Sequence, residues 1–338
     1  MTNQTQLGSI KHVASKIGNF FLEYMVLTAI VILVTVTAIV AKNVDGEHVF
    51  FTEQNLTNLM RQFGPLSFIA LGMTYVIIAQ FIDFTGPGIM ALSAYSALML
   101  IDVIGEGPAI IVGLIIGIAL GLFNGAILIK SGATTQAKAL FVTFGISTIY
   151  LAITMIMRQG QTIDRSFIES DMPIIQYISR GMIGPFTVTF AAFLALVIIF
   201  FIFENKSYLG RYIRYTGANF IAAELGGIPT KKVIMIVYAL SGLMAAVCAL
   251  VLYSRVPVVT PGMGKFFERD AILAVVVGGT SLVGGRGTVL RTVLGVSLIT
   301  LMSNCMNLLA IDSIIQEILR GGILVVAIWL DHRRHRKG

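Results

Sequence analysis

Long apolar runs alternate with short polar segments along most of the chain. A helix needs about 20 mostly apolar residues to cross the hydrocarbon core of a bilayer, and most of these runs approach or exceed that length. The pattern therefore predicts an all-α integral membrane protein. Its ten expected membrane-spanning helices lie at residues 20–41, 66–80, 87–103, 108–129, 139–157, 186–203, 233–253, 270–283, 288–307 and 314–330.

Two segments outside these runs mix polar and apolar residues. Residues 1–19 predict a short amphipathic helix on the cytoplasmic surface. Residues 43–64 predict an interfacial helix on the outer side, with Thr52 as its N-cap. No low-complexity linker or soluble domain interrupts the sequence. We therefore expect one membrane domain over residues 20–330, with a basic cytoplasmic tail at 331–338.

Composition supports the membrane assignment. The 338 residues are 56% hydrophobic and 12% charged, and the mean hydropathy is +0.88. Average soluble domains are about 45–50% apolar and about 25% charged. A soluble enzyme, a disordered chain and a disulfide-linked secreted domain are therefore excluded. Cys248 and Cys305 lie inside apolar runs without metal-ligand spacing, so we interpret them as small hydrophobic residues.

The distribution of basic residues predicts the orientation in the membrane. With both chain ends in the cytoplasm, the inner segments hold fifteen Lys and Arg residues and the outer segments hold eight. The positive-inside rule favours this arrangement. The basic residues flank apolar spans instead of covering a folded surface, so the expected partner is membrane lipid and not nucleic acid.

No motif for catalysis or for nucleotide binding occurs in the chain. The phosphate-binding loop G-x-x-x-x-G-K-[ST] and the zinc motif H-E-x-x-H are both absent. No Cys/His cluster has the spacing of a metal site, and we expect no cofactor in this chain. Spans without reactive groups predict passage of a solute, with energy supplied by another protein.

Polar residues in the spans are candidates for the solute path. Asp83 lies in a Gly/Pro-containing break, where it either marks the path or caps a helix beside Thr85. Glu317 and Arg320 are three residues apart, so we expect them to form a local ion pair. Uncharged amides and hydroxyls suit a neutral polyhydroxylated solute, although most such residues in membranes pack helices together. The uncharged path candidates are Thr85, Asn124, Thr143 and Asn304.

A weak internal repeat accompanies these breaks. Residues 82–88 read Ile-Asp-Phe-Thr-Gly-Pro-Gly, and residues 284–288, about 200 positions later, read Gly-Gly-Arg-Gly-Thr. Both segments open a helix after a short span. Transporters are often built from repeated halves with broken helices near the substrate path, although glycine-rich hairpins also resemble one another by chance.

The longest inner segment, residues 204–232, contains a short helix-forming stretch. Residues 219–225 are flanked by glycines, and Asn219 is placed as an N-cap. Ala222 and Ala223 would let another protein approach closely. The segment is thus either a docking element or an ordinary connection.

The chain resembles the permease subunits of binding-protein-dependent ABC sugar importers, in the branch for ribose, galactose, xylose and autoinducer-2. The resemblance covers residues 50–331. Its most specific parts are the inner segment and the stretch Gly-Gly-Thr-Ser-Leu at 278–282 followed by the glycine-rich 284–288. Further matching stretches are Gly-Met-Thr-Tyr-Val-Ile at 72–77, Gly-Leu-Phe-Asn-Gly at 121–125, Phe-Val-Thr at 141–143 and Tyr-Ala-Leu-Ser-Gly-Leu at 238–243.

The resemblance implies a multi-pass subunit in the bacterial inner membrane. It would pair with a second permease, identical or a sister chain, with ATPase subunits that bind ATP and Mg²⁺, and with a periplasmic solute-binding protein. In that family the short helix of the inner segment is the coupling helix. The residues that would contact the ATPase are Gly217, Asn219, Ala222, Ala223, Gly226 and Ile228.

Departures from the family pattern concern the region of substrate passage. Where the family has a glycine followed by Ile-Asp-Leu-Ser-Val-Gly, residues 81–88 read Phe-Ile-Asp-Phe-Thr-Gly-Pro-Gly. The family stretch Gly-Tyr-Glu-Leu-Asp-Ala-Ile is replaced at 265–272 by Lys-Phe-Phe-Glu-Arg-Asp-Ala-Ile. The sequence thus predicts an ABC importer permease for a sugar or sugar-like neutral solute. The alternative is a self-sufficient secondary carrier or channel, which would need no docking element.

Overall fold

The computed structural model describes residues 25–42, 46–157 and 159–336, without the side chains of Met25 and of residues 330–336. The predicted amphipathic segment at 1–19 lies outside the described residues, as does the start of the first predicted span. Of the predicted tail at 331–338, only the backbone up to residue 336 is described.

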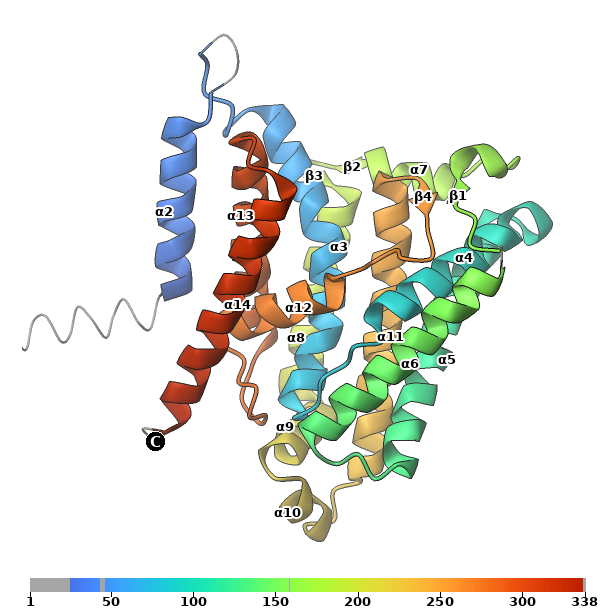
Figure 1. The fold of residues 1–338 in the computed structure, drawn as a ribbon, viewed down its shortest axis with the longest axis vertical. Helices are drawn as coiled ribbons and strands as arrows, with labels where there is room; N and C mark the ends of the chain where they lie inside the picture. The colour runs from blue at the N-terminus through green and yellow to red at the C-terminus, as the bar shows by residue number, and fades with distance from the viewer. Residues whose placement is uncertain (1–24, 43–45, 158, 337–338) are drawn as a thin grey trace, which may run out of the picture.

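Ten long helices coincide with or overlap the ten apolar runs. Most of them extend roughly along one common direction, whereas the short α12 lies across it, as Figure 1 shows. Their bounds are α2 Met25–Val40, α3 Glu53–Ile78, α4 Gly86–Ile104, α5 Glu106–Lys130, α6 Gln136–Met157, α8 Val188–Lys206, α11 Thr230–Arg255, α12 Phe267–Val277, α13 Val289–Leu308 and α14 Ser313–Arg336.

Six of these helices are long and apolar enough to cross a membrane, within the part of the chain that the structure describes: α4, α5, α6, α8, α11 and α13. The chain is therefore a multi-pass membrane protein. The described part of α2 is apolar but shorter, at 16 residues, and α12 has only 11 residues. Spanning by α2, α3, α12 and α14 stays a prediction.

Two ends of the molecule carry the shorter elements. At one end lie the helix α7 (Pro173–Arg180), the 3-10 helix η1 (Arg165–Phe167) and the strands β1 (Ile163–Asp164), β2 (Met182–Ile183), β3 (Phe186–Thr187) and β4 (Val258–Val259). The strands form two antiparallel pairs, β1 with β4 and β2 with β3. At the opposite end lie α9 (Tyr208–Ala218) and α10 (Phe220–Leu225).

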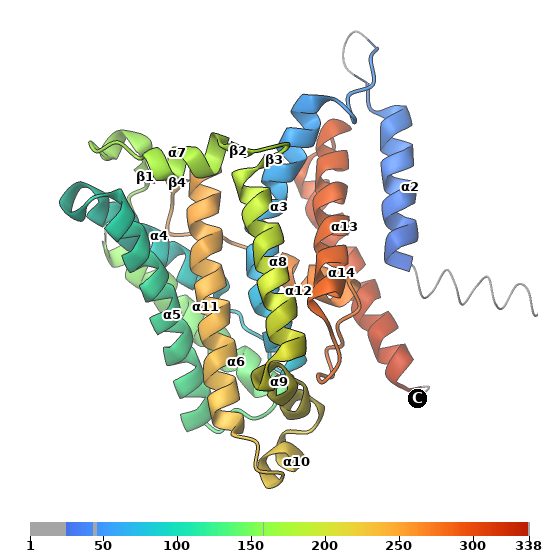
Figure 2. The same cartoon turned by 180° about the vertical axis from the view of Figure 1, so that it is seen from behind.

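The two central helices are α3 and α11. On one side, α4 and α5 pack against α11, and α6 packs against α4. On the other side, α12 and α13 pack against α3, while α2 lies on α13 and α14 on α12. Figure 2 shows the opposite face, where α8 runs beside α3. The buried core therefore lies around α3, α4 and α11.

One predicted boundary between elements is wrong. Thr52 is the N-cap, as expected, and its hydroxyl accepts a hydrogen bond from the backbone N–H of Asn55 at 3.3 Å. The helix that it starts, however, does not end at residue 64. It continues through Pro65 to Ile78 as the single helix α3. The predicted interfacial helix at 43–64 and the second span are thus one helix from residue 53, because a buried proline in a packed helix need not end it.

Two acidic side chains, one on α4 and one on α5, bind the backbone of the segment 159–185. The carboxylate of Glu106 accepts hydrogen bonds from the backbone N–H groups of Ile174 and Ile175, at 2.8 and 2.6 Å, and so caps the start of α7. Asp102 accepts one from the N–H of Ser170 at 2.8 Å. A carboxylate is favourable at a helix N-terminus because unpaired N–H groups and the positive dipole end meet there.

Small residues bring α5 and α11 into close contact. A Cβ atom at Gly121 would overlap the carbonyl oxygen of Tyr238, and one at Gly242 would overlap the carbonyl oxygen of Gly117. Close backbone approach at small residues is the usual means of helix association in membranes, because lipid gives little hydrophobic driving force between helices.

We expect Gly121→Ala to destabilise the protein by about 1–3 kcal/mol, because the new methyl group overpacks the α5–α11 contact. The matched control is Gly145→Ala in α6, where a Cβ meets no atom within 4 Å. This change should be neutral or stabilising by up to about 1 kcal/mol, because alanine is the better helix former. Thermal unfolding of the purified protein in detergent measures both effects. Equal stability of the two variants would contradict the close contact.

Candidate functional site

The connection between α3 and α4, residues 79–85, is not helical and lies inside the helix bundle. Ala79 and Gln80 form a turn, in which Gln80 has the left-handed φ of +69°, and residues 81–85 are neither helix nor strand. Asp83 and Thr85 are 1% and 0% exposed. Non-helical backbone at membrane depth needs partners from the protein, because water is not available there. Side chains from other helices must therefore supply the hydrogen bonds of this break.

Asp83 accepts hydrogen bonds through both carboxylate oxygens. Its Oδ1 accepts from the backbone N–H of Thr85 at 2.9 Å and from the Thr85 hydroxyl at 2.5 Å. Its Oδ2 accepts from the Ser241 hydroxyl on α11 at 2.8 Å. Thr85 itself occupies the N-cap position of α4 without a capping hydrogen bond of its own side chain. Asp83 thus shapes the turn into α4, and its role in solute passage stays a prediction.

A chain of side-chain hydrogen bonds extends from Asp83 across three helices. The hydroxyl of Tyr150 on α6 donates to Asn124 Oδ1 on α5 at 2.7 Å. Asn124 Nδ2 in turn donates to the Thr85 hydroxyl at 2.8 Å. Because each donor points toward Asp83, the bonds polarise one another in the same sense and strengthen the network.

Thr143 completes this group from α6. Its hydroxyl accepts from the backbone N–H of Phe84 at 3.2 Å. Asp83, Thr85, Asn124 and Thr143, four of the five predicted path residues, therefore meet at one place, which we call the break cluster. The fifth, Asn304, lies elsewhere, where its Nδ2 donates to Asn55 Oδ1 at 2.9 Å and joins α13 to α3.

The predicted short helix of the inner segment is present as α10. Asn219 is its N-cap, and the side-chain oxygen of Asn219 accepts from the N–H of Ala222 at 2.9 Å. After Gly226 the chain turns at Gly227, which has φ +80°, and the N–H of Ile228 donates to the Ala223 carbonyl at 3.0 Å. Most of the segment 204–232 is therefore helical and tightly capped.

The surface of α10 exposes two large apolar side chains together with Glu224, and a hollow lies beside it. Ile221 is 69% exposed and Leu225 is 85% exposed. Ala222 is also exposed, whereas Ala223 is 6% exposed. Of the two alanines of α10, only Ala222 is therefore accessible to a partner. The hollow measures about 270 Å³ and is lined by Tyr215, Ala218, Asn219, Ala222, Ala223, Gly226 and Ile228.

Gly217 does not lie on this surface, because it packs against the end of α3. A Cβ atom on it would overlap the carbonyl oxygen of Ile78, the last residue of α3. The same carbonyl accepts a hydrogen bond from the N–H of Gly285 at 2.8 Å. The end of α9, the end of α3 and the glycine-rich turn before α13 therefore meet at one junction, directly before the break.

Sequence reasoning missed Glu204, which links the same regions. Its side chain is 2% exposed and pairs with Arg214 on α9. Its second oxygen accepts from the backbone N–H of Val289 at 2.9 Å, at the first residue of α13. A partner 85 residues away leaves no local pattern; the only signal was an acid at the end of an apolar run.

The predicted ion pair between Glu317 and Arg320 is wrong. Arg320 instead donates to Asp270 on α12 at 3.0 Å and to the Ser303 hydroxyl on α13 at 2.9 Å. Glu317 lies 3.9 Å from Arg269. Asp270, whose side chain is 14% exposed against 46% for Glu317, is the stronger partner, because a lower dielectric around it increases the attraction.

Comparison with known proteins gives a consistent result. The family model described as branched-chain amino acid transport system / permease component matches residues 55–328. The ribose import permease protein of Haemophilus influenzae is 32% identical over 321 residues, which cover 94% of this chain and 95% of that protein. No solved structure matches the chain.

Two further relatives also carry the names of sugar permeases. The xylose transport system permease protein of Haemophilus influenzae is 28% identical over 375 aligned residues, covering 94% of this chain and 100% of that protein. The D-allose transport system permease protein of Escherichia coli is 29% identical over 285 residues, covering 83% and 84% of the two chains.

We expect Asp83→Ala to destabilise the protein by about 1–3 kcal/mol, because it leaves the buried N–H of Thr85 and the Ser241 hydroxyl without an acceptor. Asp83→Asn should lose less, because its amide oxygen still accepts from Thr85 and its NH₂ can donate to Ser241. Thermal unfolding in detergent distinguishes the two variants. Equal losses in both would show that the charge, and not the turn, is the main contribution.

Proposed function

The chain belongs to the family described as the branched-chain amino acid transport system / permease component, and we propose that it imports a sugar or sugar-like neutral solute. It is a transport membrane subunit and not an enzyme. The relatives named as ribose, xylose and D-allose permeases support a sugar over an amino acid. In this proposal separate ATPase subunits bind Mg²⁺ and ATP, and a periplasmic binding protein delivers the solute.

The observation that carries the proposal is the surface of α10. Ile221 and Leu225 project an apolar face at the tip of the molecule, beside the hollow of about 270 Å³. Exposed apolar residues beside a concavity favour a protein partner. An ATPase in contact here would touch Asn219, Ala222, Gly226 and Ile228. A self-sufficient carrier or channel has no use for such a surface.

The interior contacts of α9 suggest how a movement at this surface reaches the solute path. Gly217 touches the end of α3 next to the break, and Glu204 connects α9 through Arg214 to the first residue of α13. A shift of α9 and α10 would therefore move the ends of α3 and α13 together. We infer that the break cluster, next along the chain from α3, responds to ATP-driven closure and lines or controls the path.

The topology belongs to the same proposal. Ten spans with both chain ends in the cytoplasm place α10 and fifteen basic residues on the inner side of the bacterial inner membrane. The two glycine-containing breaks, after α3 and after α12, would be corresponding parts of an internal repeat. The core would contain a second permease, identical or a sister chain. Residues 1–19 and 331–338 would lie on the cytoplasmic surface, outside the membrane domain at 20–330.

We expect Ala222→Trp to abolish docking of the ATPase, because a bulky ring at the accessible face of α10 prevents close approach. The matched control is Ala137→Trp, at an exposed position in the first turn of α6 on the same predicted side. The permease is purified from its own membranes, and the Mg²⁺-dependent ATP hydrolysis that accompanies it is measured. Loss of at least about tenfold is expected for Ala222→Trp and no loss for Ala137→Trp. Wild-type hydrolysis in both variants would refute docking at α10.

We expect single cysteines at the two ends of the molecule to be labelled from opposite sides. Thr134→Cys lies in the α5–α6 connection, and Met182→Cys lies on β2. The native Cys248 and Cys305 are buried, so they give little background. In spheroplasts an impermeant maleimide should label Met182→Cys and leave Thr134→Cys unlabelled until the membrane is opened. Labelling of Thr134→Cys alone in intact spheroplasts would reverse the proposed orientation.

A further inference from the structure

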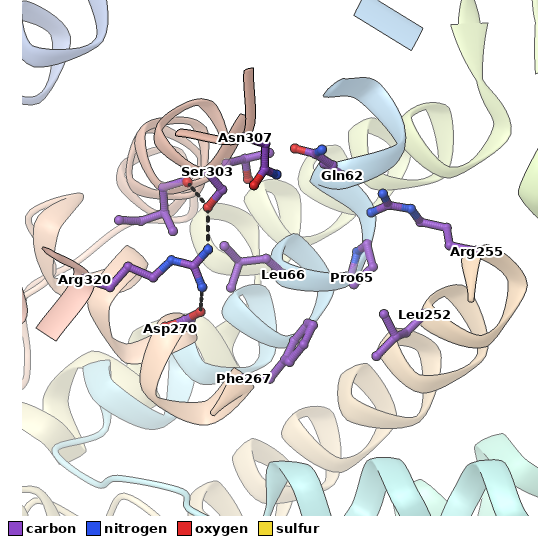
Figure 3. Close-up of a pocket in the computed structure, with 12 residues that line it drawn as sticks. Gln62, Pro65, Leu66, Leu252, Arg255, Phe267, Asp270, Ser303, Asn307 and Arg320 are labelled. Atoms are coloured by element: carbon purple, nitrogen blue, oxygen red, sulfur yellow. Dashed lines mark hydrogen bonds and ion pairs between the residues drawn. The ribbon is translucent and has the colours of Figure 1, made fainter. Parts of the chain in front are cut away.

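A second polar site lies away from the break cluster, in an open pocket lined by residues of α3, α11, α12, α13 and α14. Figure 3 shows its lining residues. Its volume of about 290 Å³ is near the lower end of the range for small-molecule pockets, roughly 300–1,000 Å³. It is lined by Arg255, the last residue of α11, and by Asn307 in the last turn of α13. Both helix ends lie opposite α10, on the side where a binding protein would deliver a solute.

Buried polar atoms without partners line this pocket. Gln62 Oε1, Thr300 Oγ1 and Arg320 Nε each have no hydrogen-bond partner among the described residues. Asp270 Oδ1 also accepts no hydrogen bond, although it forms an ion pair with Arg269 Nε at 3.7 Å. A buried polar group without a partner costs about 1–3 kcal/mol, so native structures rarely keep several in one place. Three such atoms around one cavity indicate that a polar occupant completes their hydrogen bonds.

The charged groups of the pocket are held in position before any ligand arrives. Arg320 is fixed between Asp270 at 3.0 Å and the Ser303 hydroxyl at 2.9 Å. Asp270 balances the charge of Arg320, so this wall presents donors and acceptors side by side. Phe267 adds an aromatic ring to the same cavity, and Arg255 adds further N–H donors from another wall.

We propose that this pocket binds a monosaccharide of pentose or hexose size. Adjacent hydroxyls of a sugar both donate and accept, so they match a carboxylate, an amide and a guanidinium that lie together. The apolar C–H face of the sugar ring packs on an aromatic side chain such as Phe267. Gln62 and Thr300 are specificity-determining residues, because their free oxygens accept or donate to the hydroxyls. This assignment rests on the proposed import of a sugar.

The test uses the full-length protein, purified in detergent, and measures its thermal unfolding with D-ribose, D-xylose, D-allose or D-fructose at millimolar concentration. L-Leucine and D-gluconate are the comparison ligands. At least one of the four sugars should raise the unfolding temperature, since a ligand that binds only the native state stabilises it by mass action. Absence of a shift with all four sugars, or a shift with leucine or gluconate alone, overturns the proposal.

Two variants locate the binding site. Thr300→Val and Gln62→Leu remove unpaired polar atoms without breaking a hydrogen bond within the described chain. The ligand-free variants should therefore unfold at the wild-type temperature or higher, and their apparent affinity for the sugar should fall about tenfold. The matched control is Ser93→Ala in α4, which removes an unpaired buried hydroxyl outside the pocket and should keep the wild-type affinity.

Unchanged sugar affinity in both Thr300→Val and Gln62→Leu would place the sugar elsewhere and overturn the assignment. The result is independent of ATPase docking at α10. If ATP hydrolysis accompanies the purified protein but no sugar binds, the pocket assignment alone fails. If a sugar binds through Thr300 and Gln62 but no ATPase accompanies the protein, the pocket assignment survives and the ABC importer proposal fails.

Discussion

The need to satisfy buried backbone groups at the break after α3 determines much of this structure. A helix satisfies its own peptide groups, but a non-helical segment such as residues 81–85 does not. Residues 81–85 therefore need Asp83 to accept from the N–H of Thr85, and Thr143 to accept from the N–H of Phe84. Tyr238 donates to the Ile82 carbonyl at 3.1 Å. Helices α6 and α11 must accordingly pack around the break, and with α5 they form one block with it.

The end of this block next to α9 is also where the predicted ATPase contact reaches the core. Gly217 lies against the carbonyl of Ile78, so a larger side chain there would displace α3. The N–H of Gly285 donates to the same carbonyl, and a Cβ atom on Gly285 would overlap Ala218 of α9. Contacts between backbones transmit displacement well, since they have no flexible side chain between them. The pocket at Thr300 lies toward the other end of the bundle. The proposed solute site and the proposed docking site are thus separated along the helices, and α3 and α13 extend from one to the other.

Patterns of neighbouring residues predicted the helices, but they did not predict hydrogen bonds between residues that are far apart in the sequence. Apolar runs located the long helices, and the caps at Thr52 and Asn219 followed from neighbouring residues. By contrast, Glu204 pairs with an amide 85 residues away, and Asn304 pairs with Asn55 across 249 residues. No periodicity links such positions. The ion pair expected between Glu317 and Arg320 was wrong for the same reason, because spacing on one helix says nothing of an acid on the next. The break cluster was partly predictable, since polar residues inside apolar runs are unusual.

The distance in sequence between Asp83 and its partner has a consequence for biosynthesis. Ser241 follows Asp83 by 158 residues, and a ribosome adding about 5–20 residues per second makes it roughly 8–32 s later. Until α11 arrives, insertion of the Asp83 carboxylate into lipid is unfavourable. Residues 81–85 must then stay at the aqueous surface, or be shielded by the insertion machinery, while the later helices are synthesised. The order of synthesis therefore differs from the order of burial. The segment around Asp83 is made early, but it becomes buried only after α11, with Ser241, has been made.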